Sequence, residues 1–257
     1  MKKLIALMLC ALLIAAFAAC GKTTETNAPA EQKNDEPQAA AEENAQTEEL
    51  PVNEPIAGGW ANAEDPALTD ELRAVFEKAL AELVGVNYTP IACLGTQVVA
   101  GTNYCFLAQA TVVYPDAKPT YVLVYIYQDL QGNASVMNFA DMPVIPNEYG
   151  EAEPIPADET LMGGWAYAES YEITDEIKAN LDKALASLDG ANYEPVANLA
   201  TQVVAGQNRC LLCKITPVVP NPVPHYALVY VYENLEGGAE ITPTIDLDVG
   251  ALCTYGA

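Results

Sequence analysis

Basic residues are scarce in this chain, and their scarcity excludes two classes of partner. The 257 residues include 11 lysines and arginines against 35 aspartates and glutamates, for a formal net charge of −24. A phosphate backbone or an anionic membrane surface would repel a protein of this charge. The sequence therefore predicts no nucleic-acid binding.

Histidine is scarcer still, with a single copy at position 225. Most general-base and metal-site schemes rely on imidazole, which titrates near neutral pH and is the commonest metal ligand. His225 lies between Pro224 and Tyr226, which favours a surface histidine over a Cys/His nucleophile. We therefore expect a protein that is not an enzyme and that has no metal site and no cofactor.

The chain also lacks an even disulfide framework. Beyond the first twenty residues five cysteines remain: Cys93, Cys105, Cys210, Cys213 and Cys253. Cys210 and Cys213 have no second pair for a zinc site, and on a strand their side chains point to opposite faces. All five are expected to be buried small hydrophobic residues in a chain that is 51% apolar.

The N-terminus has the pattern of an export signal over residues 1–19. Two lysines precede an apolar run that is too short to span a membrane as a mature helix, and small residues lead to Cys20. This end resembles the lipobox of bacterial lipoproteins, which implies cleavage before Cys20 and a lipid on its thiol. The expected location is the outer side of the cell membrane, held by that lipid. Ordinary signal cleavage near Ala19, which would give a secreted protein, stays open, and an uncleaved anchor is disfavoured.

Residues 20–56 change character abruptly. They consist mainly of Ala, Glu, Gln, Asn, Thr and Pro without an apolar period, so they bury too little surface to offset chain entropy. We predict a disordered acidic tether, with a binding tail as the less favoured alternative.

An internal repeat follows the tether. Residues 58–61 (GGWA) return as residues 163–166, and residues 96–101 (TQVVAG) return as residues 201–206. Each pair is offset by 105 residues (Gly58 to Gly163), and more than half of the positions from 58 to 132 are identical in the second copy. We predict domains at 57–143 and 162–250, joined by a linker at 144–161. A fragment ending near Pro143 is expected to fold alone.

Each copy contains a helix pattern followed by four β patterns. Thr69 and Thr174 are predicted N-caps, each followed by acidic residues and by apolar residues at helical spacing up to Gly85 or Gly190. In the first copy the β patterns cover residues 90–99, 103–113, 121–127 and, more weakly, 134–139.

Side-chain alternation divides the third β pattern between two faces. Val122, Val124 and Ile126 are expected under the helix, while Tyr121 and its alternate neighbours face the other way. That outer face is too apolar for open water, so it buries either against the sister copy or against a partner. An ordinary exposed sheet with amphipathic tyrosines is the equally weighted alternative.

Several motifs together resemble the cystatin superfamily, and most closely its stefin branch. They are the Gly-Gly pair at 58–59, a Pro-Ala approach to the helix, the Gln-x-Val-x-Gly hairpin at 97–101, and Leu130 before a glycine turn. The resemblance covers residues 58–142 and 163–248. It implies an α+β fold of two cystatin-like domains, each with one helix packed on a four-stranded antiparallel sheet.

The resemblance also implies a site. In cystatins the Gln-x-Val-x-Gly hairpin enters the cleft of papain-like cysteine proteases, beside a glycine segment and a second hairpin. The corresponding residues, here called the first wedge, are Gly59, Gln97, Val98, Val99, Ala100, Gly101 and Leu130. The second wedge consists of Gly164, Gln202, Val203, Val204, Ala205, Gly206 and Leu235.

These residues suit reversible contact rather than chemistry, because none is nucleophilic and the glycine permits close backbone approach. The expected function is lipid-anchored, non-covalent inhibition of papain-like cysteine proteases. The alternative is a non-inhibitory binding or structural module at the cell surface, which the absence of a proline in the second hairpin favours.

Overall fold

The computed structural model describes residues 58–147, 150–155 and 163–253. The predicted signal at 1–19, the tether at 20–56 and the lipidation site Cys20 lie outside these residues. Within them, neither helix has the length and apolar character needed to cross a membrane.

The first repeat forms a five-stranded antiparallel sheet with the order β1-β2-β3-β4-β5. Its elements, in chain order, are β1 (Trp60–Asn62), α1 (Asp70–Leu80), β2 (Val86–Val99), β3 (Gly101–Val112), β4 (Thr120–Gln128) and β5 (Ala134–Asp141). A short two-stranded sheet of β6 (Ile145–Pro146) and β7 (Ala152–Glu153) follows.

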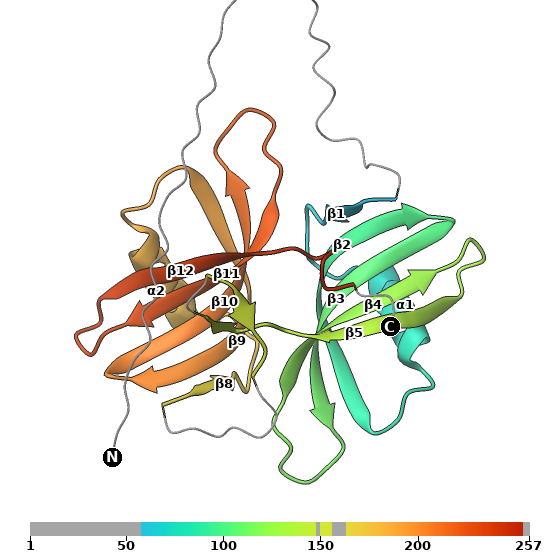
Figure 1. The fold of residues 1–257 in the computed structure, drawn as a ribbon, viewed down its shortest axis with the longest axis horizontal. Coiled ribbons are helices and arrows are strands. Elements are labelled where there is room, and N and C mark those ends of the chain that lie inside the picture. Colours follow the sequence, from blue (N-terminus) through green and yellow to red (C-terminus); the bar gives the residue numbers. More distant parts are fainter. Residues whose placement is uncertain (1–57, 148–149, 156–162, 254–257) are drawn as a thin grey trace, which may run out of the picture. The chain divides into compact units, whose positions relative to one another are not determined.

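The second repeat forms a sheet of the same design, with the order β12-β11-β10-β9-β8. Its elements are β8 (Trp165–Tyr167), α2 (Asp175–Leu185), β9 (Ala191–Val204), β10 (Gly206–Pro217), β11 (His225–Glu233) and β12 (Ala239–Leu247). Figure 1 shows the two sheets with their helices on outward faces.

Both helices begin where the sequence predicts. The Thr69 hydroxyl accepts a hydrogen bond from the Leu72 amide at 3.2 Å, and Thr174 accepts one from the Ile177 amide at 3.3 Å. Each cap occupies one of the amide groups that a helix start leaves without a partner, and two acidic residues follow it.

The predicted helix ends are wrong by several residues. Helix α1 ends at Leu80 and α2 at Leu185, so Gly85 and Gly190 do not terminate the helices. Gly85 instead has a φ of 94° and precedes β2, where its carbonyl accepts a hydrogen bond from the Val113 amide at 2.9 Å. The apolar period continues past the helix into a turn, which is why the pattern overstated its length.

Each helix covers one face of its own sheet, as the alternation predicts. In the first repeat Val122, Val124 and Ile126 are buried together with Val75 and Phe76 of α1. The second repeat has a corresponding cluster under α2.

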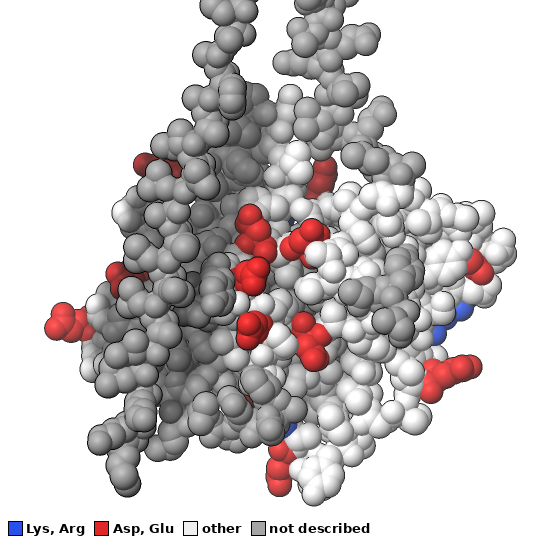
Figure 2. Space-filling model, viewed as in Figure 1, with Lys and Arg blue, Asp and Glu red and all other residues white. Residues whose placement is uncertain are grey.

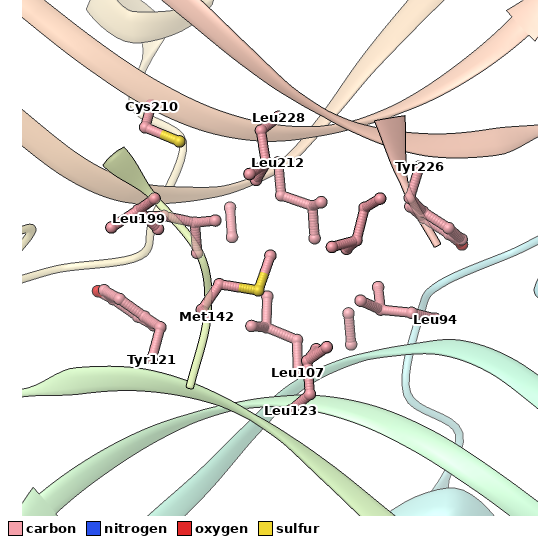
Figure 3. Packing of buried hydrophobic residues seen from close by; sticks show 14 of the residues in the cluster. Leu94, Leu107, Tyr121, Leu123, Met142, Leu199, Cys210, Leu212, Tyr226 and Leu228 are labelled. Carbon is pink, nitrogen blue, oxygen red and sulfur yellow. The ribbon is translucent and has the colours of Figure 1, made fainter. Parts of the chain in front are cut away.

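The opposite faces of the two sheets pack against each other and form one shared core. Fully buried Tyr121, Leu123 and Tyr125 belong to it, together with their counterparts in the second repeat, Tyr226, Leu228 and Tyr230. Figure 3 shows Met142, from the segment after β5, between leucines of the two sheets. The tyrosine face is therefore buried against the sister repeat. It is neither an exposed sheet nor a face left for a partner.

Hydrogen bonds across the shared core come in matched pairs. The Tyr121 hydroxyl donates to the Ala168 carbonyl at 2.8 Å, and the Tyr226 hydroxyl donates to the Ala63 carbonyl at 2.9 Å. The two bonds join corresponding residues of the two repeats, because Tyr226 lies 105 positions after Tyr121 and Ala168 lies 105 positions after Ala63. The two repeats thus contact each other as an isologous pair within one chain.

The predicted fold class is wrong. The described residues are mostly β, with twelve strands in three sheets and two helices, instead of two domains that each pack one helix on four strands. Strands β1 and β8 have three residues each, too few to show an alternation, and each adds a fifth strand to a sheet. The shared core joins the two sheets, so the prediction of a first repeat that folds alone loses its basis. The predicted domain boundaries stay predictions.

Candidate functional site

The first wedge gathers at one end of the first sheet. Trp60 pairs with Gln97, which places the glycine segment beside the end of β2. Thr102 pairs with Gln128, so the β4–β5 turn that carries Leu130 starts beside the β2–β3 turn. Strand register alone therefore brings together three segments that are far apart in the sequence.

Side-chain hydrogen bonds hold the first two segments to each other. Gln97 Nε2 donates to the Gly58 carbonyl at 2.8 Å, and the Gly58 amide donates to the Val98 carbonyl at 3.2 Å. Asn103 Nδ2 donates to Gln97 Oε1 at 2.6 Å and orients that amide. Gln97 is thus a positioning residue, whose side chain holds the neighbouring chain segment rather than facing solvent. Gly59 follows in that segment and is half-buried.

The tip of the β2–β3 turn is held from β4. The Tyr127 hydroxyl donates to the Ala100 carbonyl at 2.6 Å. Gly101 has a φ of 131°, and a Cβ at this position would collide with the carbonyl oxygen of Gln128. The glycine is therefore required by the protein's own packing.

The β4–β5 turn is held in a similar way. Asp129 accepts hydrogen bonds from the amides of Gln131 and Asn133 at 2.9 and 2.8 Å. Lys78 of α1 donates to the Gly132 carbonyl at 2.6 Å. Hydrogen bonds from Asn133 keep the pKa of the Asp129 carboxyl below its ordinary value. Leu130 at the top of this turn is 79% exposed.

In the first wedge, the glycine segment and the β2–β3 turn present apolar side chains and no charge. Val98, Val99 and Ala100 are exposed, and residues 58–63 and 96–104 contain no charged side chain. Figure 2 shows uncharged surface over β1 and the β2–β3 turn, with acidic side chains elsewhere on the same face. A rigid, uncharged apolar edge is unusual on a protein of net charge −24.

The second wedge repeats these contacts. Gln202 donates to the Gly163 carbonyl at 2.9 Å, beside Gly164, and Asn208 donates to Gln202 at 2.7 Å. Asn234 replaces the aspartate of the first β4–β5 turn and accepts from the Gly238 amide at 2.9 Å. The exposed apolar residues are Val203, Val204, Ala205 and Leu235, and Gly206 has a φ of 126° with the same backbone obstruction as Gly101.

The two wedges point away from each other. In Figure 1 the β2–β3 and β4–β5 turns lie at one side, and the β9–β10 and β11–β12 turns lie at the opposite side. This follows from the matched contacts across the shared core, which relate one repeat to the other by a rotation. Neither wedge obstructs the other.

The sequence prediction missed the residues that brace the wedges. Asn103 and Tyr127 hold the first wedge, and Trp60 packs on Tyr125 of the shared core with ring centroids 5.5 Å apart. The signal was present, because all four residues recur unchanged in the second copy. Trp165 and Tyr230 show the same contact at 5.5 Å.

Four of the five cysteines in the described residues lie within the buried clusters of the two sheets. Cys93, Cys105, Cys210 and Cys213 are buried free thiols, as predicted, while Cys253 is half-buried. Burial raises the pKa of Cys93 to about 11 and that of Cys213 to about 12. Cys210 lies in the shared core and Cys213 under α2, on opposite faces of the sheet.

The histidine and the acidic residues give no metal centre in the described ranges. His225 Nε2 lies 3.3 Å from Asp246 Oδ1, in a partly exposed pair. Over the same ranges, no group of three or more His, Cys, Asp or Glu side chains is arranged to hold a metal ion.

Comparison with known proteins adds no relative. No protein-family model matches the chain, and no curated protein matches its sequence. The resemblance to cystatins stays a prediction.

Proposed function

We propose that the protein is an exported, lipid-anchored and reversible inhibitor of papain-like cysteine proteases, with one binding edge in each repeat. The observation that carries this proposal is the gathering of Gly58–Gly59, Val98–Ala100 and Leu130 into one apolar edge, whose first two segments have no charged side chain. An edge of this kind suits a protease cleft without a covalent step, because it offers mainly apolar packing surface and backbone groups and has no nucleophile.

The hydrogen bonds within each wedge support the same function. Bonds from Gln97, Asn103 and Tyr127 fix the turns before any partner arrives, so less conformational entropy is lost on binding. The alternative of a binding module that uses its sheet face is less favoured, because the two sheet faces bury each other.

Titration of papain with the protein tests the proposal. Val98 and Val203 are exposed in corresponding positions, at 50% and 70%, so Val98→Asp and Val203→Asp place a carboxylate in each wedge with little effect on folding. In each altered wedge we expect affinity to fall at least about 30-fold, the effect of losing roughly 2 kcal/mol at a central contact. The double variant should not inhibit at concentrations where the parent does.

The stoichiometry gives a second readout. Two unobstructed wedges predict two papain molecules for each parent chain and one for each single variant. Val113→Asp and Val218→Asp are matched controls, because these valines are 64% and 65% exposed in the loops at the other end of the sheets. A parent that does not inhibit papain, or controls that impair inhibition equally, would overturn the proposal.

A further inference from the structure

The two wedges differ in charge on their second hairpins, which are the β4–β5 turn and the β11–β12 turn with the strand ends beside them. Residues 126–137 correspond to residues 231–242 at the offset of 105 (Ile126 to Val231). The first stretch contains one acidic residue and the second contains three, and neither stretch contains a basic residue. The replacements are Gln128 by Glu233, Gln131 by Glu236, Ser135 by Glu240 and Asp129 by Asn234.

The acidic residue of the first hairpin is occupied within its own turn. Asp129 accepts hydrogen bonds from the amides of Gln131 and Asn133, and a third from Asn133 Nδ2 at 2.8 Å. Most of the acceptor capacity of this carboxylate is therefore used inside the protein. The first wedge has no other carboxylate on its hairpins.

Strand register places Glu240 beside the tip of the second wedge. Glu240 pairs with Tyr232, whose hydroxyl donates to the Ala205 carbonyl at 2.7 Å. Side chains of directly paired residues lie on the same face of an antiparallel sheet, with Cβ atoms about 5 Å apart. In the first repeat the corresponding residue, Ser135, lines a hollow of about 410 Å³ together with Val99 of the wedge. This position therefore adjoins the contact edge in both repeats.

Glu236 lies at the top of the β11–β12 turn, directly after Leu235, which is 85% exposed. The side chains of Glu236 and Glu240 are exposed, and neither takes part in the ion pairs found among the described residues. Glu233 differs from them, because it is half-buried and accepts a hydrogen bond from Asn180 Nδ2 at 2.6 Å. Glu236 and Glu240 are thus the carboxylates of this hairpin that a partner can reach.

Two basic residues near the second wedge do not cancel this difference. Lys183 donates to a backbone carbonyl of the β11–β12 turn at 3.3 Å, and Lys78 makes the matching contact in the first repeat, so this charge is common to both wedges. Arg209 pairs with Val231, which is buried under α2. The Arg209 side chain therefore lies on the opposite face of the sheet from Glu240.

We propose that the two wedges select different proteases, an inference that rests on the proposed function. The second wedge favours a papain-like protease with lysine or arginine side chains on the rim of its cleft, which pair with Glu236 and Glu240. The first wedge has no such carboxylates and no such preference. Charges at the rim of an interface chiefly determine partner choice and association rate, so these two glutamates are specificity-determining residues.

Papain in two charge forms tests the proposal: the native enzyme and a form whose lysines are succinylated, which replaces each positive charge by a negative one. Val98→Asp leaves only the second wedge intact, and Val203→Asp leaves only the first. Succinylation should weaken inhibition by the second wedge roughly three- to tenfold more than inhibition by the first, because exposed ion pairs there become like-charge contacts. This excess should shrink at about 0.3 M salt, which screens exposed charges.

Exchange of residues between the repeats locates the preference. In the protein with only the second wedge intact, Glu236→Gln combined with Glu240→Ser should remove the excess. In the protein with only the first wedge intact, Gln131→Glu combined with Ser135→Glu should create it. All four side chains are exposed, so we expect these variants to fold as the parent does.

Asp189→Asn combined with Glu172→Gln is the matched control, because it removes the same charge from exposed positions of the second repeat outside the hairpin. It should leave the excess unchanged. Equal effects of succinylation on the two wedges, or loss of the excess in the control, would overturn the proposal and leave protease inhibition standing. If papain is inhibited through the first wedge only, the variant with Gln131→Glu and Ser135→Glu decides alone. A parent that inhibits neither form of papain would refute the proposed function, and this inference with it.

Discussion

Substitution of Leu123 by alanine should destabilise both repeats, although this residue belongs to the first. Its side chain is fully buried in the shared core, where leucines of the second repeat face it (Figure 3). Loss of a buried leucine costs about 2–5 kcal/mol, because the removed methyl groups leave a cavity that closes only partly. If the two sheets unfold as one unit, this cost lowers the free energy of unfolding of both repeats equally.

The two tryptophans provide an assay with one reporter in each repeat. Trp60 packs on Tyr125 and Trp165 on Tyr230, so the fluorescence of each depends on the structure of its own repeat. In a Trp60→Phe background, Leu123→Ala should lower the thermal midpoint reported by Trp165 by about 4–20 °C, at roughly 2–4 °C for each kcal/mol. In a Trp165→Phe background, Trp60 should report the same shift.

Leu130→Ala is the matched control, because the same atoms are removed from a side chain that is 79% exposed. It should change the free energy of unfolding by no more than about 0.5 kcal/mol. A Trp165 midpoint that stays constant while the Trp60 midpoint falls would refute the cooperative unit and restore two independent domains.

Three further predictions follow from burial. A fragment that ends at Pro143 should give no cooperative unfolding transition in circular dichroism, because it exposes its half of the shared core; a cooperative transition would contradict this. Among the cysteines of the described residues, Cys253 should be alkylated first by iodoacetamide in peptide mapping, because the other four are buried; earlier labelling of Cys93 would contradict it. The free energy of unfolding should fall above about pH 9, because burial raises the pKa of Cys93 from 9.0 to about 11 and that of Tyr121 from 10.0 to about 12. The unfolded chain therefore loses these protons at lower pH than the folded protein does, and rising pH favours unfolding. Urea midpoints that do not change from pH 8 to 10.5 would contradict this argument.

Much of each repeat could be predicted because local signals and tertiary packing agree. Thr69 and Thr174 cap their helices because a threonine hydroxyl accepts a hydrogen bond from an amide that the first turn of a helix leaves unpaired. This bond is local and does not depend on how the helix packs. The alternation at 121–127 separated the helix face from the tyrosine face correctly, since side chains of a strand alternate regardless of context.

Other features depend on contacts that a sequence pattern does not contain. Alternation shows that a sheet face is apolar, but the identity of the covering surface is a property of tertiary packing. Strand β1 is similarly hidden, because its three residues are strand only through pairing with β2.

Gly101 shows how one residue type can serve two requirements that sequence reasoning cannot separate. The motif suggests that this glycine gives a protease cleft access to the backbone, and a bulky substitution would then test binding. In the structure a Cβ at Gly101 would collide with the Gln128 carbonyl oxygen, and φ is 131°. Any substitution therefore disturbs the junction of the two turns before a partner is involved. Loss of inhibition on changing Gly101 would show only that the first wedge must be intact. Val98 and Leu130 are exposed and free of such constraints, so substitutions there test direct contact with the protease.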